Sequence, residues 1–411
     1  MAQLNITLNQ DEILQLLQES SEDAFRNLLQ ECLNGVLQVE SSAQLRAERY
    51  ERTDERTDSR NGTRIRPLVT RLGGIELKVP RHRNVPFKTL VFDNYKRSEA
   101  ALVTTMAEMV VAGVSTAKVS RVMEELCGKS YSKQAVSEAC KVLDSAVEEF
   151  RQRPLGGDYY FVMADATYIK VRENHRIIAK ALLVAMAMTA EGMKEIIGVS
   201  LADAETYESW KEFLQSLKQR GLKDMFMFTS DAHEGLVGAL HKVYPNVPWQ
   251  RCQAHFTRNI VDAAPKYLKE GLRSELTEMF NCETLQETRK REDEIISDYS
   301  IKAPKAMEIL DAGFEEAMTV MILPKDMRRC ARTSNYLERL NKEIKRRSKV
   351  VGIFPNASSA LRLMGAVLME ENDRWATMRP IYSKASGLEL KKKSQILIDL
   401  ARQQCLLAEV A

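Results

Sequence analysis

The sequence of 411 residues lacks the marks of several large protein classes. Its seven cysteines are scattered without a Cys-x-x-Cys pair, which argues against a disulfide scaffold and is typical of a reducing cytosol. No signal layout of basic, apolar and small residues opens the chain. The longest apolar run, residues 181–188, is too short to cross a bilayer. We therefore expect a cytoplasmic protein of two or three domains that does not contact a membrane.

Acidic residues are scarce in one early stretch. Residues 60–97 contain ten lysines or arginines against two acids, whereas residues 1–50 contain eight acids and three arginines. The formal net charge of +3 does not reveal this contrast. A basic stretch behind an acidic one indicates separate tasks, with the basic part facing a polyanion.

The first segment, residues 1–58, is predicted to be helical. Apolar residues recur at three- and four-residue steps between residues 10 and 48, which is typical of one or two amphipathic helices. Such helices cannot bury their own apolar face, so they pack either on a partner chain, as a dimerisation segment, or on the rest of this chain. Both alternatives are open at this point, and the polar residues 49–61 are expected to form a linker.

A basic β-hairpin is predicted within residues 59–97. Apolar and charged residues alternate over residues 75–79 after the turn signal Gly73-Gly74, and residues 65–70 supply a partner strand. A solvated charged face is the ordinary interpretation, but the lack of balancing acids favours contact with phosphates. The DNA-contact candidates of this segment are Arg60, Arg64, Arg66 and Arg81.

Three helices are predicted within residues 98–153, over residues 98–112, 116–126 and 133–150. Gly113 lies at the sharp turn after the first helix, and Ser132 is a candidate N-cap of the third. This order resembles a helix-turn-helix, in which Lys133 and Gln134 would meet base edges early in the third helix. Three-helix units are also common in proteins that do not bind DNA, so this interpretation is open.

The pattern becomes strand-rich in residues 154–258. Strands are predicted over residues 159–171, 176–188 and 194–200, followed by a helix over 206–220, a strand over 225–229, a helix over 234–244 and a strand over 247–251. This order is that of the ribonuclease-H-like α/β fold. Its first three strands form an antiparallel meander, and a helix then crosses over to a parallel fourth strand.

Two acids lie at special places in this fold. Asp165 interrupts the first strand and Asp231 ends the fourth, so we expect the two to be neighbours. A single Asp in such a place is equally well explained by a bend in which its carboxylate accepts backbone hydrogen bonds. Two adjacent carboxylates repel each other unless a cation lies between them, and hard divalent ions, Mg²⁺ above all, are held by such oxygen pairs. A third acid is then expected from a later helix.

The rest of the chain is predicted to be helical. Residues 259–328 form an all-helical insertion, residues 329–376 return to the core, and residues 377–411 form a C-terminal helical tail. In the returning helix, capped by Thr333 or Ser334, the polar residues Asn335, Glu338 and Asn341 stand three apart. A basic cluster follows, which is either a solvated face or a grip on a phosphodiester backbone. Its DNA-contact candidates are Lys345, Arg346 and Lys349.

Several motifs occur in a fixed order across roughly residues 60–375. They are the basic hairpin and residues 165–172, 208–210, 220–222, 230–236, 249–259, 333–341 and 351–356. Together they resemble the transposases of bacterial insertion sequences related to the Mutator element. Ala166 and Ala232 depart from that pattern, since the family often has Gly at both positions.

This resemblance implies a DDE transposase. Its triad would be Asp165, Asp231 and Glu338, holding two Mg²⁺ ions per active site, with Mn²⁺ as a substitute. The enzyme would cleave at terminal inverted repeats and join the freed 3′-hydroxyls to double-stranded target DNA. A homodimer or larger assembly is expected, because two DNA ends must be paired. Further DNA-contact candidates are Lys170, Arg172, Arg258, Asn335 and Asn341.

The pair Cys252-x-x-His255 is a signature of the same family. Two ligands do not complete a tetrahedral zinc site, and no second pair lies nearby in the sequence. We therefore assign His255 to the catalytic site, where it orients a carboxylate or touches the scissile phosphate. A core histidine bonded to backbone is the alternative for this residue. For the whole protein the alternatives are a ribonuclease-H-like nuclease without strand transfer and a non-catalytic DNA-binding regulator.

Overall fold

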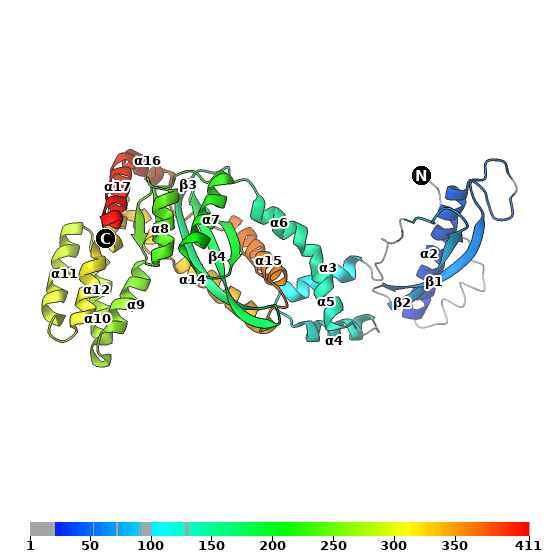
Figure 1. Cartoon of the computed structure of the whole chain (residues 1–411), viewed down its shortest axis with the longest axis horizontal. Helices are drawn as coiled ribbons and strands as arrows, with labels where there is room; N and C mark the ends of the chain where they lie inside the picture. Colours follow the sequence, from blue (N-terminus) through cyan, green and yellow to red (C-terminus); the bar gives the residue numbers. More distant parts are fainter. Residues whose placement is uncertain are drawn as a thin grey trace. The chain divides into compact units, whose positions relative to one another are not determined.

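The computed structural model describes residues 21–51, 53–70, 73–89, 91, 100–127 and 131–410. Contacts between residues divide the chain into two compact units, residues 1–143 and 144–411, which are described separately (Figure 1). The predicted amphipathic stretch from residue 10 therefore lies partly outside the described residues. No helix in the described part of the chain is long and apolar enough to span a membrane.

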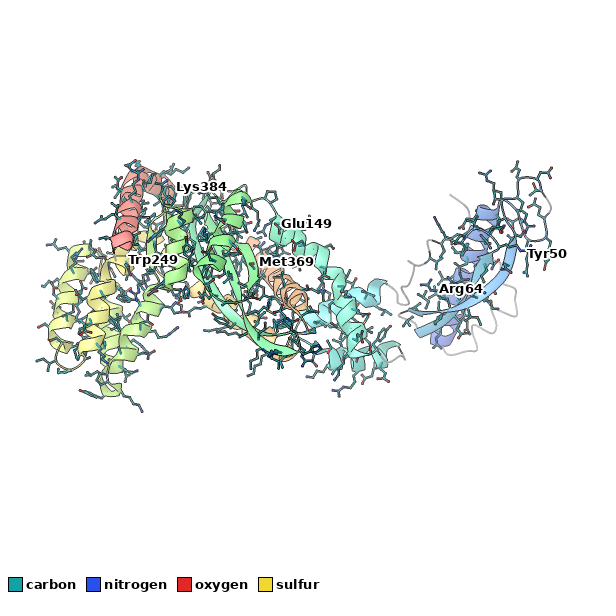
Figure 2. All side chains as sticks on the ribbon, viewed as in Figure 1. Tyr50, Arg64, Glu149, Trp249, Met369 and Lys384 are labelled. Carbon is teal, nitrogen blue, oxygen red and sulfur yellow. The ribbon has the colours of Figure 1, made fainter. Side chains whose placement is uncertain are left out.

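The first unit contains a helix packed on a hairpin. Helix α2 (Ser21–Leu45) covers the antiparallel strands β1 (Arg60–Thr70) and β2 (Gly73–His82). Alternation places Ile75, Leu77 and Val79 in a common core with Leu37 of α2. Apolar residues of α2 thus pack on the hairpin of this chain, and dimerisation through the first segment stays a prediction. The predicted hairpin is confirmed, and its first strand begins five residues earlier than expected. Arg64 is exposed on β1 (Figure 2).

Three short helices complete this unit. They are α3 (Ala100–Val111), α4 (Thr116–Cys127) and α5 (Lys133–Ala139), and the Ser132 hydroxyl caps α5 by accepting from the Ala135 amide at 3.0 Å. The prediction of one continuous helix over residues 133–150 is wrong. The chain tightens into the 3₁₀ turn η1 (Cys140–Leu143), and α6 (Asp144–Gln152) belongs to the second unit. The two halves have separate cores: Val136 is buried with α3 and α4, whereas Val147 of α6 packs against Gly365.

The second unit is built on a five-stranded mixed sheet in the order β5-β4-β3-β6-β7. Strands β3 (Tyr159–Glu173), β4 (Arg176–Thr189) and β5 (Lys194–Ala202) form an antiparallel meander. Strands β6 (Met227–Ser230) and β7 (Trp249–Arg251) continue the sheet in parallel to β3. The predicted meander and parallel fourth strand are confirmed, although β6 and β7 each begin two residues later than expected.

Helices pack on both the strands of this sheet and the residues that follow them. Helices α7 (Tyr207–Gln219) and α8 (Glu234–Val243) bury Trp210, Leu214 and Leu240 against the strands in one core. Helix α14 (Asn335–Val351) contacts β3, and α15 (Ala357–Ala376) contacts β3 and β5. Strand β3 is buried along most of its length, so that a charged residue within it needs a specific partner.

A helical region lies between β7 and α14 in the sequence. It comprises α9 (Gln253–Ala263), η2 (Lys266–Leu268), α10 (Lys269–Met279), α11 (Leu285–Tyr299), α12 (Pro304–Met318), η3 (Thr319–Ile322) and α13 (Lys325–Ala331). Phe256, Leu276 and Leu310 belong to its own apolar core. The chain ends in α16 (Lys384–Lys392) and α17 (Ser394–Val410). The helical character predicted for residues 259–328 is therefore present.

Candidate active site

Asp165 is held in β3 by two hydrogen bonds. Its Oδ1 accepts from the Ala166 amide at 2.9 Å, and its Oδ2 accepts from Asn341 Nδ2 of α14 at 2.8 Å. Burial, and then the charge of Asp231, raise the pKa of Asp165 to about 6. The ionised carboxylate is thus disfavoured in this place unless positive charge is brought to it.

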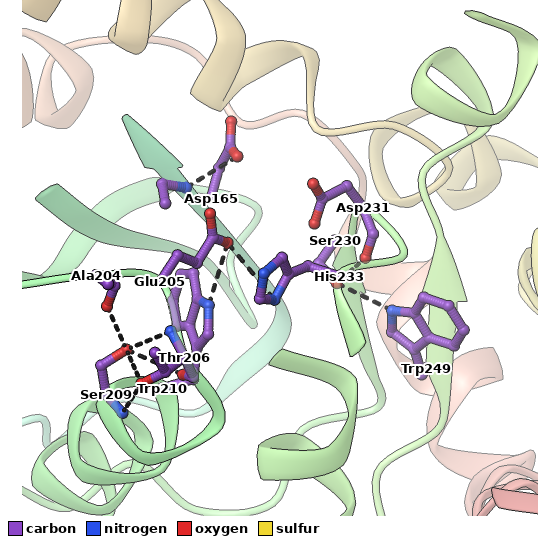
Figure 3. Close-up of polar contacts among 11 residues, drawn as sticks. Asp165, Ala204, Glu205, Thr206, Ser209, Trp210, Ser230, Asp231, His233 and Trp249 are labelled. Carbon is purple, nitrogen blue, oxygen red and sulfur yellow. Dashed lines mark hydrogen bonds and ion pairs between the residues drawn. The ribbon is translucent and has the colours of Figure 1, made fainter. Parts of the chain in front are cut away.

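Asp231 lies next to Asp165 because β3 and β6 are parallel neighbours. Met163 pairs with Thr229, and each Asp follows two residues later on its own chain segment. The Ser230 carbonyl accepts from the Cys252 amide at 2.7 Å, and the Ser230 hydroxyl accepts from Trp249 Nε1 at 3.0 Å (Figure 3). Within the described residues no donor reaches the Asp231 carboxylate. The backbone is fixed while the carboxylate stays available.

Glu338 lies in the first turn of α14, three residues before the Asn341 that bonds Asp165. Its Oε1 lies 3.6 Å from His255 Nε2 and 3.5 Å from Arg258 Nη2, both on α9. Both separations are long for hydrogen bonds. In the described part of the chain this buried oxygen has no hydrogen-bond partner. Glu338 is therefore held by positive charge and keeps an oxygen free to bind a ligand.

Cys252 connects the start of α9 to the start of α14. The amide and hydroxyl of Ser334 donate to its Sγ at 3.3 and 3.2 Å. Burial alone would raise the pKa of Cys252, but hydrogen bonds from His255 and Ser334 outweigh burial and lower it. The bond to Cys252 raises the pKa of His255, against the effect of burial and with help from Asp165 and Glu338.

The prediction that the side chain of Thr333 or Ser334 caps α14 is not met by a hydrogen bond at Ser334. Ser334 occupies the N-cap position, but its side chain makes no capping hydrogen bond. The hydroxyl donates to the Cys252 thiol instead, because Ser334 is buried against that residue. A contact across 82 residues of sequence therefore replaces a local one.

Carboxylate oxygens are the ligands that hard divalent cations prefer. Asp165 and Asp231 fit such an ion, since burial and then the charge of Asp231 raise the pKa of Asp165, and the Asp231 carboxylate has no competing donor in the described chain. Among the residues that the structure describes, however, no three His, Cys, Asp or Glu side chains stand close enough to hold one ion together. The two aspartates are therefore the part of a metal site that is already assembled, whereas Glu338 lies beside His255 and Arg258.

A second polar group lies beside the two aspartates and was not predicted. Glu205, in the loop after β5, accepts a hydrogen bond from Trp210 Nε1 at 3.2 Å and lies 3.8 Å from His233 Nδ1 (Figure 3). Burial raises the pKa of Glu205. The charge of His233 and the hydrogen bond from Trp210 lower this pKa, and the negative charge of Asp231 raises it further. The group thus supports the turn that carries Asp231. Its sequence signals are an acid just after a strand and a histidine two residues beyond Asp231.

The loop bearing Glu205 fits closely on α8. Thr206 and Ser209 form a capping box at the start of α7. A Cβ added to Gly235 would lie 2.8 Å from the Tyr207 amide nitrogen, nearer than side chains approach backbone in proteins. This contact explains a glycine at the start of α8 and fixes the two loops against each other.

The predicted DNA contacts of the second unit fall into two groups. Asn341 is buried and bonded to Asp165, so it positions the acid. Arg346 is paired with Glu343 at 2.8 and 2.6 Å. The others are exposed side chains on β3, α9 and α14. They are Lys170, Arg172, Arg258, Asn335, Lys345 and Lys349.

In the first unit, Arg60 is engaged within the protein. Its guanidinium donates to the Glu48 and Ala47 carbonyls at 3.0 and 3.1 Å and to the Ser42 hydroxyl at 2.8 Å. This arginine ties the hairpin to the end of α2. The candidates Arg64, Arg81, Lys133 and Gln134 are exposed, and Arg66 is partly buried.

Comparison with known proteins decides the family. The model of a family described as "Transposase, Mutator family" matches residues 1–378. The chain belongs to the Mutator family of transposases. It is 40% identical over 396 residues to the transposase for insertion sequence element IS256 in transposon Tn4001 of Staphylococcus aureus, covering 95% of this chain and 100% of that protein. The resemblance seen in the sequence is thereby confirmed.

Two further relatives extend this result. The transposase for insertion sequence element ISRM5 of Rhizobium meliloti is 38% identical over 356 residues, covering 87% of this chain and 89% of the relative. The transposase for insertion sequence element IS1081 of Mycobacterium tuberculosis is 37% identical over 381 residues, covering 92% and 91%. Membership of the Mutator family makes this chain an insertion-sequence transposase, which implies that it cuts and joins DNA and that it uses divalent metal.

Proposed function

We propose that this Mutator-family transposase binds the terminal inverted repeats of its own insertion sequence, cleaves there and joins the freed 3′-hydroxyls to target DNA. The observation that carries the proposal is the pairing of β3 with β6, which puts Asp165 beside Asp231, while Glu338 stands three residues before the Asn341 that bonds Asp165. The strand order β5-β4-β3-β6-β7 supports a ribonuclease-H-like core around this site.

Asp165 and Asp231 would hold divalent ions, with Glu338 as the third acid. Two Mg²⁺ ions, or Mn²⁺ in their place, supply activation of the attacking hydroxyl and stabilisation of the departing 3′-oxygen when bound. The carboxylate donor set and the free Glu338 oxygen in the described chain support this assignment.

The chain's own residues prepare the site. Asn341 orients Asp165 through a hydrogen bond to a charged acceptor, which is among the stronger kinds. The raised pKa of His255 favours its charged form, so that it and Arg258 present positive charge beside Glu338. That charge suits the phosphate of a bound DNA strand. Cys252 accepts hydrogen bonds from Ser334 and so ties the start of α9, which carries His255, to the start of the helix that carries Glu338.

DNA binding outside the catalytic site belongs to the first unit in this proposal. The hairpin offers Arg64 and Arg81 on an exposed basic surface, and α5 offers Lys133 and Gln134 in its first turn. Phosphate contacts would position the duplex, and the start of α5 would read bases. Pairing of two element ends calls for at least a homodimer.

A labelled duplex carrying the terminal repeat tests the proposal. In the presence of Mg²⁺ the wild type should cut the duplex at the repeat end and join that end to an unlabelled plasmid. Asp165→Asn, Asp231→Asn and Glu338→Gln should each retain DNA binding and lose both reactions. Cutting without joining would instead identify a nuclease, and binding without cutting a regulator.

A further inference from the structure

A pocket of about 540 Å³ lies where α14 begins and is separate from the acids described above. Arg329 and Cys330 of α13 contribute to its wall, as does Asp326. Its remaining lining includes Arg332, Thr333, Asn335, Tyr336 and Arg339, and we name it the arginine pocket. Nothing in the proposed chemistry uses this pocket.

The positive charge of the arginine pocket is not neutralised within the described chain. Arg329 and Arg339 are exposed, and no described carboxylate lies within 4.0 Å of either guanidinium. Arg332 donates only to neutral oxygens, the Phe280 carbonyl at 3.2 Å and Asn281 Oδ1 at 3.0 Å. The lining acid, Asp326, accepts a hydrogen bond from the Ser386 hydroxyl. Three guanidinium groups therefore face one carboxylate.

These cations also influence one another. Burial, and then the charge of Arg329, lower the pKa of Arg332. Lys194 extends the group, since its ammonium lies 4.9 Å from the centre of the Tyr336 ring. Burial lowers the pKa of Lys194, followed by the charges of Arg374 and Arg339. Like charges gathered around a cavity are stabilised by an anion, and guanidinium groups match phosphate oxygens in geometry.

The arginine pocket adjoins the catalytic face of α14. Asn335 precedes Glu338 by three residues, which brings their Cβ atoms to about 5–6 Å on a helix, and Arg339 directly follows Glu338. A strand with one phosphate at Glu338 would carry a neighbouring phosphate to the pocket. Because Lys194 lies over the Tyr336 ring, that ring is not free to stack on a base from this side.

We propose that the arginine pocket binds a backbone phosphate of the DNA strand that occupies the active site, close to the scissile phosphate. This inference rests on the proposed function. Recognition is by charge, so the contact holds DNA of any sequence and does not select the terminal repeat. Arg329 and Arg339 supply the exposed charges, and the partly buried Arg332 supplies a third.

The salt dependence of DNA binding tests the assignment. The full-length double variant Arg329→Ala/Arg339→Ala should show a slope of log K against log salt that is shallower by about 1 than that of the wild type. The loss should be equal for two duplexes that share the terminal repeat but differ in flanking sequence. The double variant Arg329→Lys/Arg339→Lys, which keeps both charges, should retain most of the slope.

A matched control uses an arginine that already has acidic partners. Arg291 of α11 pairs with Glu278 at 3.2 Å and Glu294 at 2.9 Å, so Arg291→Ala should leave the slope unchanged. Inorganic phosphate at millimolar concentration should not compete with DNA. Competition by inorganic phosphate would instead identify a site for small anions and overturn the assignment.

Two results separate this inference from the proposed function. If the wild type cuts and joins DNA but the alanine variant, folded as judged by its thermal melt, keeps the wild-type slope, only the pocket assignment fails. If the alanine variant shows the expected slope change but the wild type never cuts DNA, the pocket assignment stands and the proposed catalysis fails. A loss confined to one flanking sequence would show base readout and would also overturn the assignment.

Discussion

Removing the charge of Asp165 should stabilise the metal-free protein at neutral pH. The pKa of Asp165 is about 6 in the folded chain, above the ordinary value of 3.8. Between these two values the folded chain holds a proton that the unfolded chain has lost. Stability of the wild type is therefore fully present below about pH 4 and falls as the pH rises towards 6. The shift of about 2 pH units corresponds to roughly 3 kcal/mol.

Asp165→Asn is uncharged at every pH and should escape this penalty. Asn341 can turn its amide to accept from the new side chain, since its Oδ1 has no hydrogen-bond partner in the described chain. The free energy of unfolding of the variant should exceed that of the wild type by an amount that grows by about 2 kcal/mol from pH 4 to pH 7. Urea unfolding with a chelator present, at steps of one pH unit, measures this difference.

The control for this series is Asp224→Asn, because Asp224 is exposed and lies outside the site. Asp224→Asn removes one surface carboxylate and leaves the site intact, so it controls for the loss of a negative charge as such. Added Mg²⁺ should stabilise the wild type and Asp224→Asn but not Asp165→Asn. A difference between Asp165→Asn and wild type that stays flat with pH would refute the claim that burial and the charge of Asp231 raise the pKa of Asp165.

Three further substitutions test neighbouring parts of the structure. Asn341→Ala removes a charge-assisted bond to Asp165 worth about 1.5–3 kcal/mol, so cleavage should slow roughly 10- to 150-fold and need more Mg²⁺, whereas Asn246→Ala at the surface should not slow it. Glu292→Gln should raise the urea midpoint at pH 8 and have little effect at pH 4, because burial, Asp311 and Asp293 raise the pKa of Glu292 to about 8. Gly235→Ala should destabilise by about 1–3 kcal/mol, while Gly238→Ala, whose Cβ meets only the Tyr207 ring at 3.4 Å, should be neutral or stabilising in thermal melts.

Much of the fold could be predicted because its signals are local. The apolar run of β3 is long and β-rich, the strand after α7 is short but fully apolar up to Phe228, and the order of the strands indicates a meander followed by a parallel strand. The break between α5 and α6 could not be predicted from the spacing of apolar residues. Residues 133–150 keep helical spacing throughout, but Val136 and Val147 are buried in different cores, and only tertiary packing distinguishes these.

In the candidate site too, some residues could be predicted from local sequence signals and others depend on tertiary packing. Asp165 and Asp231 could be found because strand position makes an acid conspicuous, and the parallel pairing of β3 with β6 follows from the strand order. Glu205 and His233 could not be paired, since each belongs to a separate loop and their meeting depends on how α7 and α8 pack. The spacing on α14 predicts Asn341 as a DNA contact, whereas the folded chain bonds its side chain to Asp165, a partner that sequence spacing does not reveal.

The position of Glu338 follows from charge balance. Without cations, a third carboxylate beside Asp165 and Asp231 would add to the repulsion that already raises the pKa of Asp165. Glu338 instead lies near the positive side chains of His255 and Arg258, at 3.6 and 3.5 Å. These separations are too long for strong bonds, so little is lost when the carboxylate leaves them. With divalent metal bound, the repulsion among the three carboxylates would be offset, and Glu338 could turn from His255 and Arg258 to hold the metal together with Asp165 and Asp231. His255 and Arg258 would then be released beside the site, where a DNA phosphate needs positive charge.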